Sequence, residues 1–433
     1  MNYRAATAET TDLLFSKRVK FAFHGARLEF DLARTLFASA GIDTGSALLL
    51  RHMMEAEVGQ HDQKVDTVLD LGSGHGVLGV VFGALDPQRS VTFGDRDALA
   101  VDYSARNARL NGLGDNNVTT VGTLGLDGIN PPVGGFDLVM SNIPGKIGAP
   151  AIAELVMGAA KVTRLDGYVA FVVVDPLVDC IEELLGSDQF GDVTTRSTKA
   201  HTAFTARVVK RPVVPAIDEG DAASSTSEPQ SGFDRGVYDR DQADFRTGKL
   251  AWKATTVNGI DEFDSLGYAT TLLASAFENL KKGPVVVVNP GQGHRAIVAA
   301  QSGRPVTTVV GRDLLGLHAT ARMIRENGAG PEPELVHTAE HPSGSLQNFD
   351  SIVAVIVHTE DKVQTPDLLA QANTIIEGLR RVEPHPRLII TGRASNLGRL
   401  EAELVRARTA RVEVKISKRG WRVLRLAPTI PKT

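Results

Sequence analysis

The sequence repeats one order of features at domain scale, and this repeat constrains the fold more than any other feature. The first half contains, in order, GIDTGSALLLRHM, VDTVLDLGSGHGVLGVVFGA, VTFGDRDALAVDYSARNARLNG and GGFDLVMSNIPGK. The second half contains, in the same order, EFDSLGYATTLLASAF, GPVVVVNPGQGHRAIVAA, VTTVVGRDLLGLHATARMIRENG and NFDSIVAVIVHTE. Residues 97–111 and 313–327 share their spacing, and both run from Asp into Asn-Gly. A repeat of this length indicates the duplication of a whole domain.

Each half alternates short β-branched segments with amphipathic helical segments. This alternation is typical of a mostly parallel sheet that is covered by helices on both faces. In the first half the pattern predicts a helix at 98–110, a closing antiparallel hairpin at 192–198 and 202–210, and strands at 67–71, 90–93, 136–141 and 167–174.

The chain of 433 residues is too long for one core, because single cores stop growing at roughly 250 to 300 residues. Residues 212–244 are rich in Pro, Ser, Gly and acid and lack apolar periodicity, which predicts an acidic flexible linker. We therefore expect a first domain at 1–211 and a second domain at 245–433.

The composition indicates an ordinary globular protein, with 42% hydrophobic and 23% charged residues. Because no run of about 18 uncharged apolar residues occurs, we expect neither a membrane span nor a secretion signal. The single cysteine, Cys180, has no partner for an internal disulfide and no accompanying metal-ligand set. These features predict a cytoplasmic protein without a metal site.

The charge balance argues against a protein that coats nucleic acid by charge alone, because the formal net charge is −4. Residues 406–432 nevertheless contain nine basic residues against one acid, Glu413. Such a patch is compatible with RNA contact, and a solvated strand face explains it about as often.

A glycine-rich turn follows the first predicted strand, where ligands bind in sheets of this kind. Gly74, Gly76 and Gly79 satisfy the dinucleotide pattern G-x-G-x-x-G, which alone is a weak signal. Asp70 precedes them at the strand tip, where its carboxylate would repel a pyrophosphate and attract the amino group of a methionine moiety. The turn therefore favours S-adenosylmethionine over a dinucleotide.

Three ordered motifs resemble those of class I methyltransferases of the "methyltransferase small domain" family. VLDLGSGHGVLGV resembles their motif I, GDRDALAVDYSARNARLNGL their second-strand motif and FDLVMSNIPGK their Asn-Pro-Pro-aromatic motif. The family includes bacterial ribosomal RNA guanine-amine methyltransferases that are themselves tandem duplications. The resemblance implies two tandem Rossmann-like domains, each with a mostly parallel seven-stranded sheet and a C-terminal antiparallel hairpin.

By this resemblance the first turn holds the methionine end of the cofactor, and the acid at the end of the second strand holds the ribose. The segment before the first predicted strand closes over both. The residues implied are, in that order, Asp70, Gly72, Ser73, Gly74 and Gly76; Asp95 and Arg96; and Asp43, Thr44 and Gly45. Thr123 occupies the slot where the family usually has an acid for the adenine amine. Asn142 completes the implied cofactor set.

The segment SNIPGK forms the implied acceptor tip. The Asn142 side-chain oxygen and the Ile143 carbonyl would accept the two N–H bonds of a planar amine, and Pro144 would stiffen the tip. Gly145 stands where the family has an aromatic ring that stacks on the base. Phe37 or Phe23 is the predicted replacement for that ring, and Lys146 would pair with an acidic acceptor.

The second copy keeps the apolar strands and loses the polar site. Aligned by sequence, Asn289 replaces Asp70, Arg295 replaces Gly76, Gly311 replaces Asp95 and Val355 replaces Asn142. We expect a degenerate second domain that packs on the first or presents substrate. The tandem ribosomal RNA enzymes have the opposite order, with the degenerate copy first.

The sequence thus predicts a methyltransferase that uses S-adenosylmethionine and acts on an exocyclic amine, guanine N2, in ribosomal RNA. Two alternatives remain open. One is transfer to a small molecule or a protein side chain, for which Gly145 makes room. The other is a cofactor-binding protein without turnover.

Overall fold

A computed structural model describes residues 4–58, 64–211, 230–340, 351–359 and 363–430. The chain forms two compact units. One unit runs from Ser16 to Tyr238, and the other combines the residues up to Phe15 with those from Asp239 onward. We call them the first and second units, in the order of their sheets along the chain, and describe each by itself.

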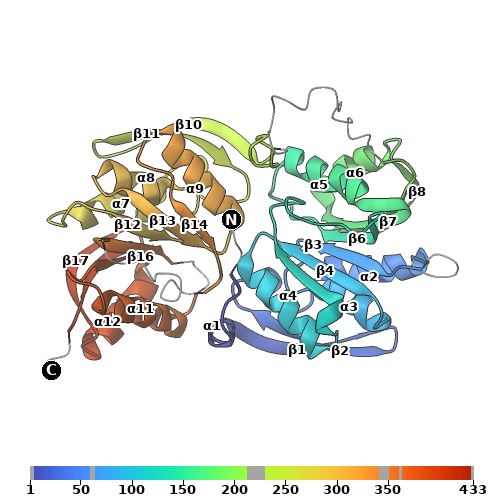
Figure 1. Cartoon of the computed structure of the whole chain (residues 1–433), viewed down its shortest axis with the longest axis horizontal. Helices are drawn as coiled ribbons and strands as arrows, with labels where there is room; N and C mark the ends of the chain where they lie inside the picture. Colours follow the sequence, from blue (N-terminus) through green and yellow to red (C-terminus); the bar gives the residue numbers. More distant parts are fainter. Residues whose placement is uncertain (1–3, 59–63, 212–229, 341–350, 360–362, 431–433) are drawn as a thin grey trace. The chain divides into compact units, whose positions relative to one another are not determined.

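The first unit is built on a seven-stranded sheet of order β5-β4-β3-β6-β7-β9-β8 (Figure 1). Strands β3 to β7 pair in parallel, and the β8–β9 hairpin adds antiparallel to β7. The strands are β3 (Thr67–Leu71), β4 (Ser90–Asp95), β5 (Val118–Gly122), β6 (Phe136–Asn142), β7 (Thr163–Val174), β8 (Phe190–Ser197) and β9 (His201–Val208). A separate two-stranded sheet, β1 (Phe15–Phe23) and β2 (Ala26–Ala33), precedes them.

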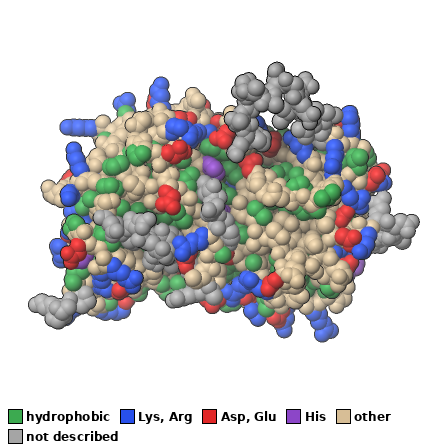
Figure 2. Space-filling view, viewed as in Figure 1, with side chains coloured by type: hydrophobic (Ala, Val, Ile, Leu, Met, Phe, Trp, Pro, Cys, Tyr) green, Lys and Arg blue, Asp and Glu red, His purple; other side chains and the backbone are tan. Residues whose placement is uncertain are grey.

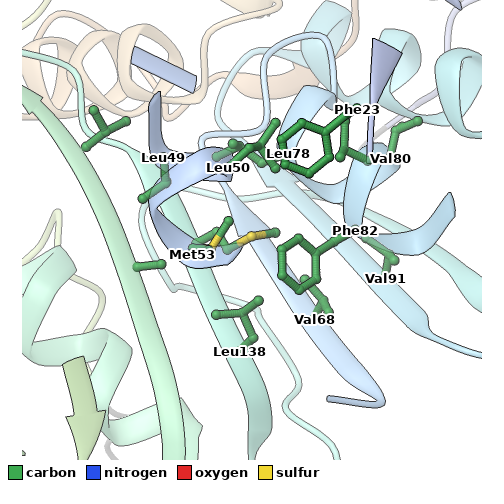
Figure 3. Close-up of a cluster of buried hydrophobic side chains, with 14 of the residues drawn as sticks. Phe23, Leu49, Leu50, Met53, Val68, Leu78, Val80, Phe82, Val91 and Leu138 are labelled. Carbon is green, nitrogen blue, oxygen red and sulfur yellow. The ribbon is translucent and has the colours of Figure 1, made fainter. Parts of the chain in front are cut away.

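Helices cover both faces of this sheet. Successive side chains of a strand point to opposite faces, so apolar side chains of the strands pack against helices on each side. The helices are α2 (Thr44–Glu55), α3 (Val77–Leu85), α4 (Ala98–Leu110), α5 (Ala149–Val162) and α6 (Val178–Leu185). Figure 3 shows one core, in which Leu50 and Met53 of α2 and Phe82 of α3 gather over Val68 and Leu138 of the sheet. The alternate strand residues, such as Leu69 and Val139, pack with α5 and α6 in a second core.

The second unit has the same strand plan, with the order β14-β13-β12-β15-β16-β18-β17. Its strands are β12 (Val285–Val288), β13 (Val306–Gly311), β14 (Glu334–His337), β15 (Ala354–His358), β16 (Arg387–Arg393), β17 (Ala410–Lys418) and β18 (Trp421–Pro428), preceded by the hairpin β10 (Asp239–Thr247) and β11 (Leu250–Val257). Its helices are α1 (Ala8–Leu13), α7 (Tyr268–Leu273), α8 (His294–Gln301), α9 (Leu314–Glu326), α11 (Thr365–Arg380) and α12 (Ala394–Arg406). The prediction of two α/β domains with a C-terminal antiparallel hairpin is confirmed.

The duplication extends to individual hydrogen bonds. Asn111, which caps the end of α4, accepts from the Glu29 N–H at 2.9 Å and donates to the Glu29 carbonyl at 2.7 Å. Asn327 caps α9 and makes the same two bonds to Lys253, at 3.1 and 2.8 Å. Both asparagines therefore tie a helix end to the preceding hairpin, which explains why both copies keep the Asn-Gly ending.

The unit boundaries differ from the predicted domains at both ends. Arg4 donates its backbone N–H to the His337 carbonyl at 2.9 Å, so the N-terminal residues belong to the second unit. Of the predicted linker, residues 212–229 lie outside the described residues. Residues 230–238 fold as turns of the first unit, and residues 239–244 lie in β10, so the linker prediction is wrong there.

Among the described residues, none of the helices combines the length and the apolar character that a membrane crossing requires.

The first core predicts a large effect of truncating Phe82, whose side chain is fully buried. Replacing Phe82 with Ala removes the ring and leaves a cavity, so we expect a loss of about 3–5 kcal/mol in unfolding free energy. Hydrogen exchange with mass spectrometry should show the loss in peptides of residues 64–211. Leu165→Ala is the control, because Leu165 is 53% exposed and should change stability by less than about 0.5 kcal/mol. Equal effects of the two changes would contradict this account of the core.

Candidate functional site

A cavity of about 400 Å³ lies at the carboxyl ends of the parallel strands of the first unit. Its walls include Asp70 of β3, Asp95 of β4, Thr123 after β5 and Asn142 of β6. In a parallel sheet these strand ends share one edge, and ligand cavities of this size typically form there. The topology thus brings four predicted site residues to one place.

The glycine turn needs its glycines for two different reasons. Gly72, Gly74 and Gly76 have φ values of 72°, 56° and 76°, in the left-handed region that glycine adopts most readily. A Cβ on Gly76 would lie 3.1 Å from the Ser104 backbone, so this glycine lets α3 approach α4. Gly74 has open space around its missing Cβ and donates its N–H to Asp95 Oδ2 at 2.9 Å. Gly76 is therefore a packing residue, and Gly72 and Gly74 line the cavity.

Asp70 is 1% exposed and accepts the Gly79 N–H of α3 at 2.8 Å through Oδ2. Burial raises the pKa of Asp70 to about 7, and the nearby charge of Asp95 adds to that rise. A buried carboxyl with a raised pKa gains most from a cation beside it, because the cation compensates the lost hydration of the charge. The wall at Asp70 is therefore suited to an ammonium group.

Asp95 anchors the turn from the neighbouring strand. It accepts the N–H groups of Gly74 and Asp97, at 2.9 and 2.8 Å. Burial raises the pKa of Asp95 to about 6, with the charge of Asp97 as the next cause. Asp97 itself caps α4 by accepting from Leu99, as its position before the helix predicts.

Asn142 is held in one orientation by helix α2 and its N-cap, Asp43. Its Nδ2 donates to Asp43 Oδ2 at 2.8 Å and to Ser46 Oγ at 3.0 Å. A carboxylate accepts hydrogen bonds only, so the amide nitrogen must face Asp43. The Asn142 side-chain oxygen is then the free acceptor at the cavity, as the predicted acceptor geometry requires.

The structure brings most of the predicted site residues together around the cavity. Those that line it are Phe37, Asp43, Asp70, Gly72, Ser73, Gly74, Asp95, Arg96, Thr123, Asn142, Ile143 and Pro144. Five others do not line it: Phe23, Thr44, Gly45, Gly76 and Lys146. Phe23 is buried in the first core instead. Thr44 and Lys146 are exposed, and Gly45 packs against the His201 ring, which a Cβ would approach to 3.0 Å. Phe37 is 71% exposed.

Three cavity residues carry no sequence signal of their own. Val174 and His201, which pair across β7 and β9, line the cavity. Tyr238, which falls within the predicted linker, lines it as well. A Cβ on Gly145 would lie 3.4 Å from Val174 Cγ2. Val174 therefore fills part of the space that the missing aromatic ring leaves.

The sequence of this region matches a known family. Residues 27–201 match the family described as "Methyltransferase small domain". This segment is therefore similar to a methyltransferase small domain. The matched span contains helix α2, the glycine turn and the tip of β6, so it includes most of the cavity wall.

Two named relatives are similar to parts of this chain. Ribosomal RNA large subunit methyltransferase G of Vibrio campbellii is 30% identical over 125 residues, which are 29% of this chain and 30% of that protein. Ribosomal RNA small subunit methyltransferase C of Serratia proteamaculans is 30% identical over 169 residues, 37% of this chain and 45% of that protein. The chain thus spans less than half the length of these relatives.

One solved structure has the fold of the whole chain. It is a 16S rRNA N2 methyltransferase of T. thermophilus in complex with AdoMet and guanosine, with a TM-score of 0.60. The match covers 95% of this chain and 98% of that chain at 14% identity, which shows the tandem fold.

The strand register corrects the sequence alignment between the first copy and the second copy. Asp70 lies opposite Phe93, and Val287 lies opposite Val309. Both partners stand two residues before the ends of their strands, β4 and β13. Val287 therefore occupies the position of Asp70, and the assignment of Asn289 to that position is wrong.

The helix starts support the same correction. Helices α3 and α8 begin directly after the left-handed glycines Gly76 and Gly293. Arg295 then corresponds to Leu78 rather than to Gly76. The two turns, GSGHG and PGQGH, both alternate glycine with another residue, so a shift of two positions still aligns glycine with glycine.

The acceptor tip changes in the same way. His358, and not Val355, occupies the position of Asn142, since each is the last residue of its strand in equivalent registers. The second copy therefore has no acid at the Asp70 and Asp95 positions and no amide at the Asn142 position. The conclusion that this copy is degenerate stands on the corrected residues.

A buried arginine fills the corresponding space in the second unit. Arg295 is 4% exposed and donates to Glu262 Oε2 and to Thr270 Oγ1, both at 3.1 Å. Its Nη2 would lie 2.8 Å from a Cβ on Gly291, so the guanidinium sits over the glycine turn. The arginine thus fills the space over the turn, from the position that corresponds to Leu78.

Carboxylates pair with some of the nine basic residues of the C-terminal segment. On the face in Figure 2, Lys and Arg side chains alternate with Asp and Glu and do not gather in one patch. The pairs within the segment and its neighbours are Arg411 and Arg425 with Glu413, and Lys415 and Arg422 with Glu401.

The two raised carboxyl pKa values predict a pH dependence of stability. The folded protein binds protons at Asp70 and Asp95 more tightly than the unfolded chain, whose aspartates have pKa values near 3.8. The free energy of unfolding should therefore fall as the pH rises from about 4 to about 7, by at most about 1.4 kcal/mol per pH unit and group.

Asp70→Asn should flatten this dependence, because Asn still accepts the Gly79 N–H without the charge. Thermal unfolding of the protein without ligand, between pH 5 and pH 8, measures the effect. Glu183→Gln, at an exposed position of α6, is the control and should leave the slope unchanged. A slope that Asp70→Asn does not alter would contradict the raised pKa of Asp70.

Proposed function

We propose that this protein is an S-adenosylmethionine-dependent methyltransferase that modifies an exocyclic amine of a base, guanine N2, in ribosomal RNA. One observation carries the proposal: Asn142 is locked by Asp43 so that its side-chain oxygen is the free acceptor at a cavity whose opposite walls fit a methyl donor. The protein would act in the cytoplasm.

The residues of the cavity fit S-adenosylmethionine. The Asp70 carboxyl suits the ammonium group, and the left-handed Gly72 and Gly74 let the backbone approach a ligand closely. The Ser141 hydroxyl, which lines the same wall, is buried and has no hydrogen-bond partner in the described residues. Buried hydroxyls usually have a partner, so a ligand that supplies one would remove a cost.

S-adenosylmethionine, when bound, supplies an electrophilic methyl group. The protein's part is mostly orientation, because methyl transfer is an in-line displacement. Asn142 Oδ1 and the Ile143 carbonyl accept the two N–H bonds of a planar amine and direct its lone pair toward the methyl carbon. The amine nitrogen would form the new N–C bond as the methyl–sulfur bond of the donor breaks. The sulfur would keep the bonding electron pair, and the proton that the amine loses would pass to water.

The acceptor proposal draws on the relatives. The two curated relatives are named as ribosomal RNA methyltransferases, and the solved structure with the same fold contains guanosine. A guanine N2 amine is planar and carries two N–H bonds, which matches the two acceptors at the tip. Transfer to a small molecule or protein side chain is the second candidate, because Val174 leaves the cavity without an aromatic platform at Gly145.

We assign the chemistry to the first unit and a structural or substrate-binding role to the second. The second unit lacks Asp70, Asp95 and Asn142 equivalents, and Arg295 fills its site.

The Asn142 orientation predicts a specific kinetic defect. Asn142→Ala removes the acceptor oxygen, so methyl transfer to unmodified ribosomal RNA should slow on the order of 100-fold. Binding of S-adenosylmethionine should change much less, because the Asp70 and Asp95 walls remain. Tritium transfer from labelled donor in single-turnover reactions, with equilibrium dialysis of the donor, separates the two effects.

Thr198→Ala is the control, since Thr198 is exposed between β8 and β9 and does not line the cavity. Full activity of Asn142→Ala would contradict the assignment of Asn142 to the acceptor site. Transfer of label to protein extract or metabolites but not to RNA would favour the second candidate. Absence of transfer to every acceptor, with the donor bound, would leave a cofactor-binding protein.

A further inference from the structure

A short segment within the predicted linker is built into the wall of the cavity. The Gly232 N–H donates to Asp127 Oδ2 at 3.0 Å, and Arg235 pairs with Glu154 of α5 at 2.5 Å. Phe233 and Tyr238 are buried, with 3% and 6% exposure. These contacts fix residues 231–238 on the first unit, next to the loop that follows β5.

Tyr238 brings a polar group into this wall. Its hydroxyl oxygen lies 2.8 Å from where Gly125 would carry a Cβ, so only glycine leaves room for the ring. Within the described residues this hydroxyl makes no hydrogen bond, although the ring is more than nine-tenths buried and lines the cavity. Buried tyrosine hydroxyls usually have a partner.

Thr123, the residue expected at the adenine slot, is already engaged. Its hydroxyl donates within the loop, where the Gly125 and Asp127 carbonyl oxygens lie at 3.0 and 2.5 Å, and the residue is 2% exposed. Thr123 therefore holds the shape of the loop. The hydroxyl left for a ligand at this end of the cavity is that of Tyr238.

The order of the strands decides which part of a ligand would meet Tyr238. Asn142, Asp70, Asp95 and Thr123 stand at the ends of β6, β3, β4 and β5, which are neighbours in that order. A methyl donor with its methyl group at Asn142 must therefore extend its nucleoside toward β4 and β5. Tyr238 lies beside the loop after β5, at the far end of this line.

We propose that Tyr238 binds the base of the methyl donor, and that the segment leading into the second unit thereby completes the donor site of the first. The hydroxyl would hydrogen-bond to the purine edge, and the ring would close the cavity over it. Burial raises the pKa of Tyr238 to about 12, so the hydroxyl stays protonated and can donate or accept. This inference rests on the proposed methyl-donor function.

Binding measurements on the full chain test the inference without any need for turnover. The probes are S-adenosylhomocysteine and 5′-methylthioadenosine, and the second keeps the nucleoside but lacks the amino-acid end. Tyr238→Phe should weaken both by about 3- to 10-fold, the effect of one hydrogen bond. Tyr238→Ala should weaken both by at least about 30-fold, because the ring contact is lost as well.

Two control variants make the result specific. Tyr168→Phe changes a tyrosine of β7 that does not line the cavity, so it should bind both probes like the unaltered protein. Asp70→Asn should weaken S-adenosylhomocysteine but not 5′-methylthioadenosine. This contrast separates the amino-acid end from the nucleoside end.

Unchanged affinity of Tyr238→Phe and Tyr238→Ala for both probes, with normal binding by the unaltered protein, would overturn the inference alone. A failure of the unaltered protein to bind either probe would overturn the proposed function and the inference with it. Tyr238→Phe keeps the ring and its packing, so its result does not depend on whether Tyr238→Ala folds.

Discussion

The Asp43 carboxylate is the interaction on which the site depends. One oxygen, Oδ2, accepts from the Ser46 N–H at 2.9 Å and from Asn142 Nδ2 at 2.8 Å. It therefore caps α2 and fixes the tip of β6 in a single contact, although Asp43 and Asn142 are 99 residues apart. An amide that is free to rotate would present nitrogen or oxygen to the cavity, and a capped helix removes that freedom. Helix capping and acceptor orientation are thus one interaction.

Much of the fold follows from local pattern. The predicted helix 98–110 has the bounds of α4, because an apolar stripe, the Asp97 cap and the Asn-Gly ending all act within the segment. The sequence also predicts that the strand ends at Asp70 and Asp95 lie close together, for a different reason. Parallel strands that are joined by helices must place their carboxyl ends at one edge.

The remaining features depend on contacts that no local pattern encodes. The hydroxyl of Thr123 turns inward to its own loop, and Val174 reaches Gly145 only because β7 lies beside β6. The alignment error in the second copy has a similar origin. Its alternating glycines fit at two registers, and only the pairing of Val287 with its neighbouring strands decides between them.

The two copies show which interactions belong to the fold and which to the chemistry. The asparagines that end α4 and α9 keep the same pair of backbone bonds, so the scaffold persists where the ligand walls have changed. Arg295 and Glu262 add a buried ion pair to the second copy. A buried pair adds little to stability once the loss of hydration of both charges is counted.

The placement of Tyr238 shows that the segment matched by the family and the compact unit around the cavity have different bounds. The family motifs fall within residues 27–201, but the compact body that encloses the cavity runs from Ser16 to Tyr238, and Asp239 already belongs to β10. A fragment cut at Arg211 would keep every motif and yet leave the cavity without one wall. The segment that matches the family is therefore shorter than the segment that encloses the cavity. Residues 231–238, which lie between the two repeats, supply the missing wall.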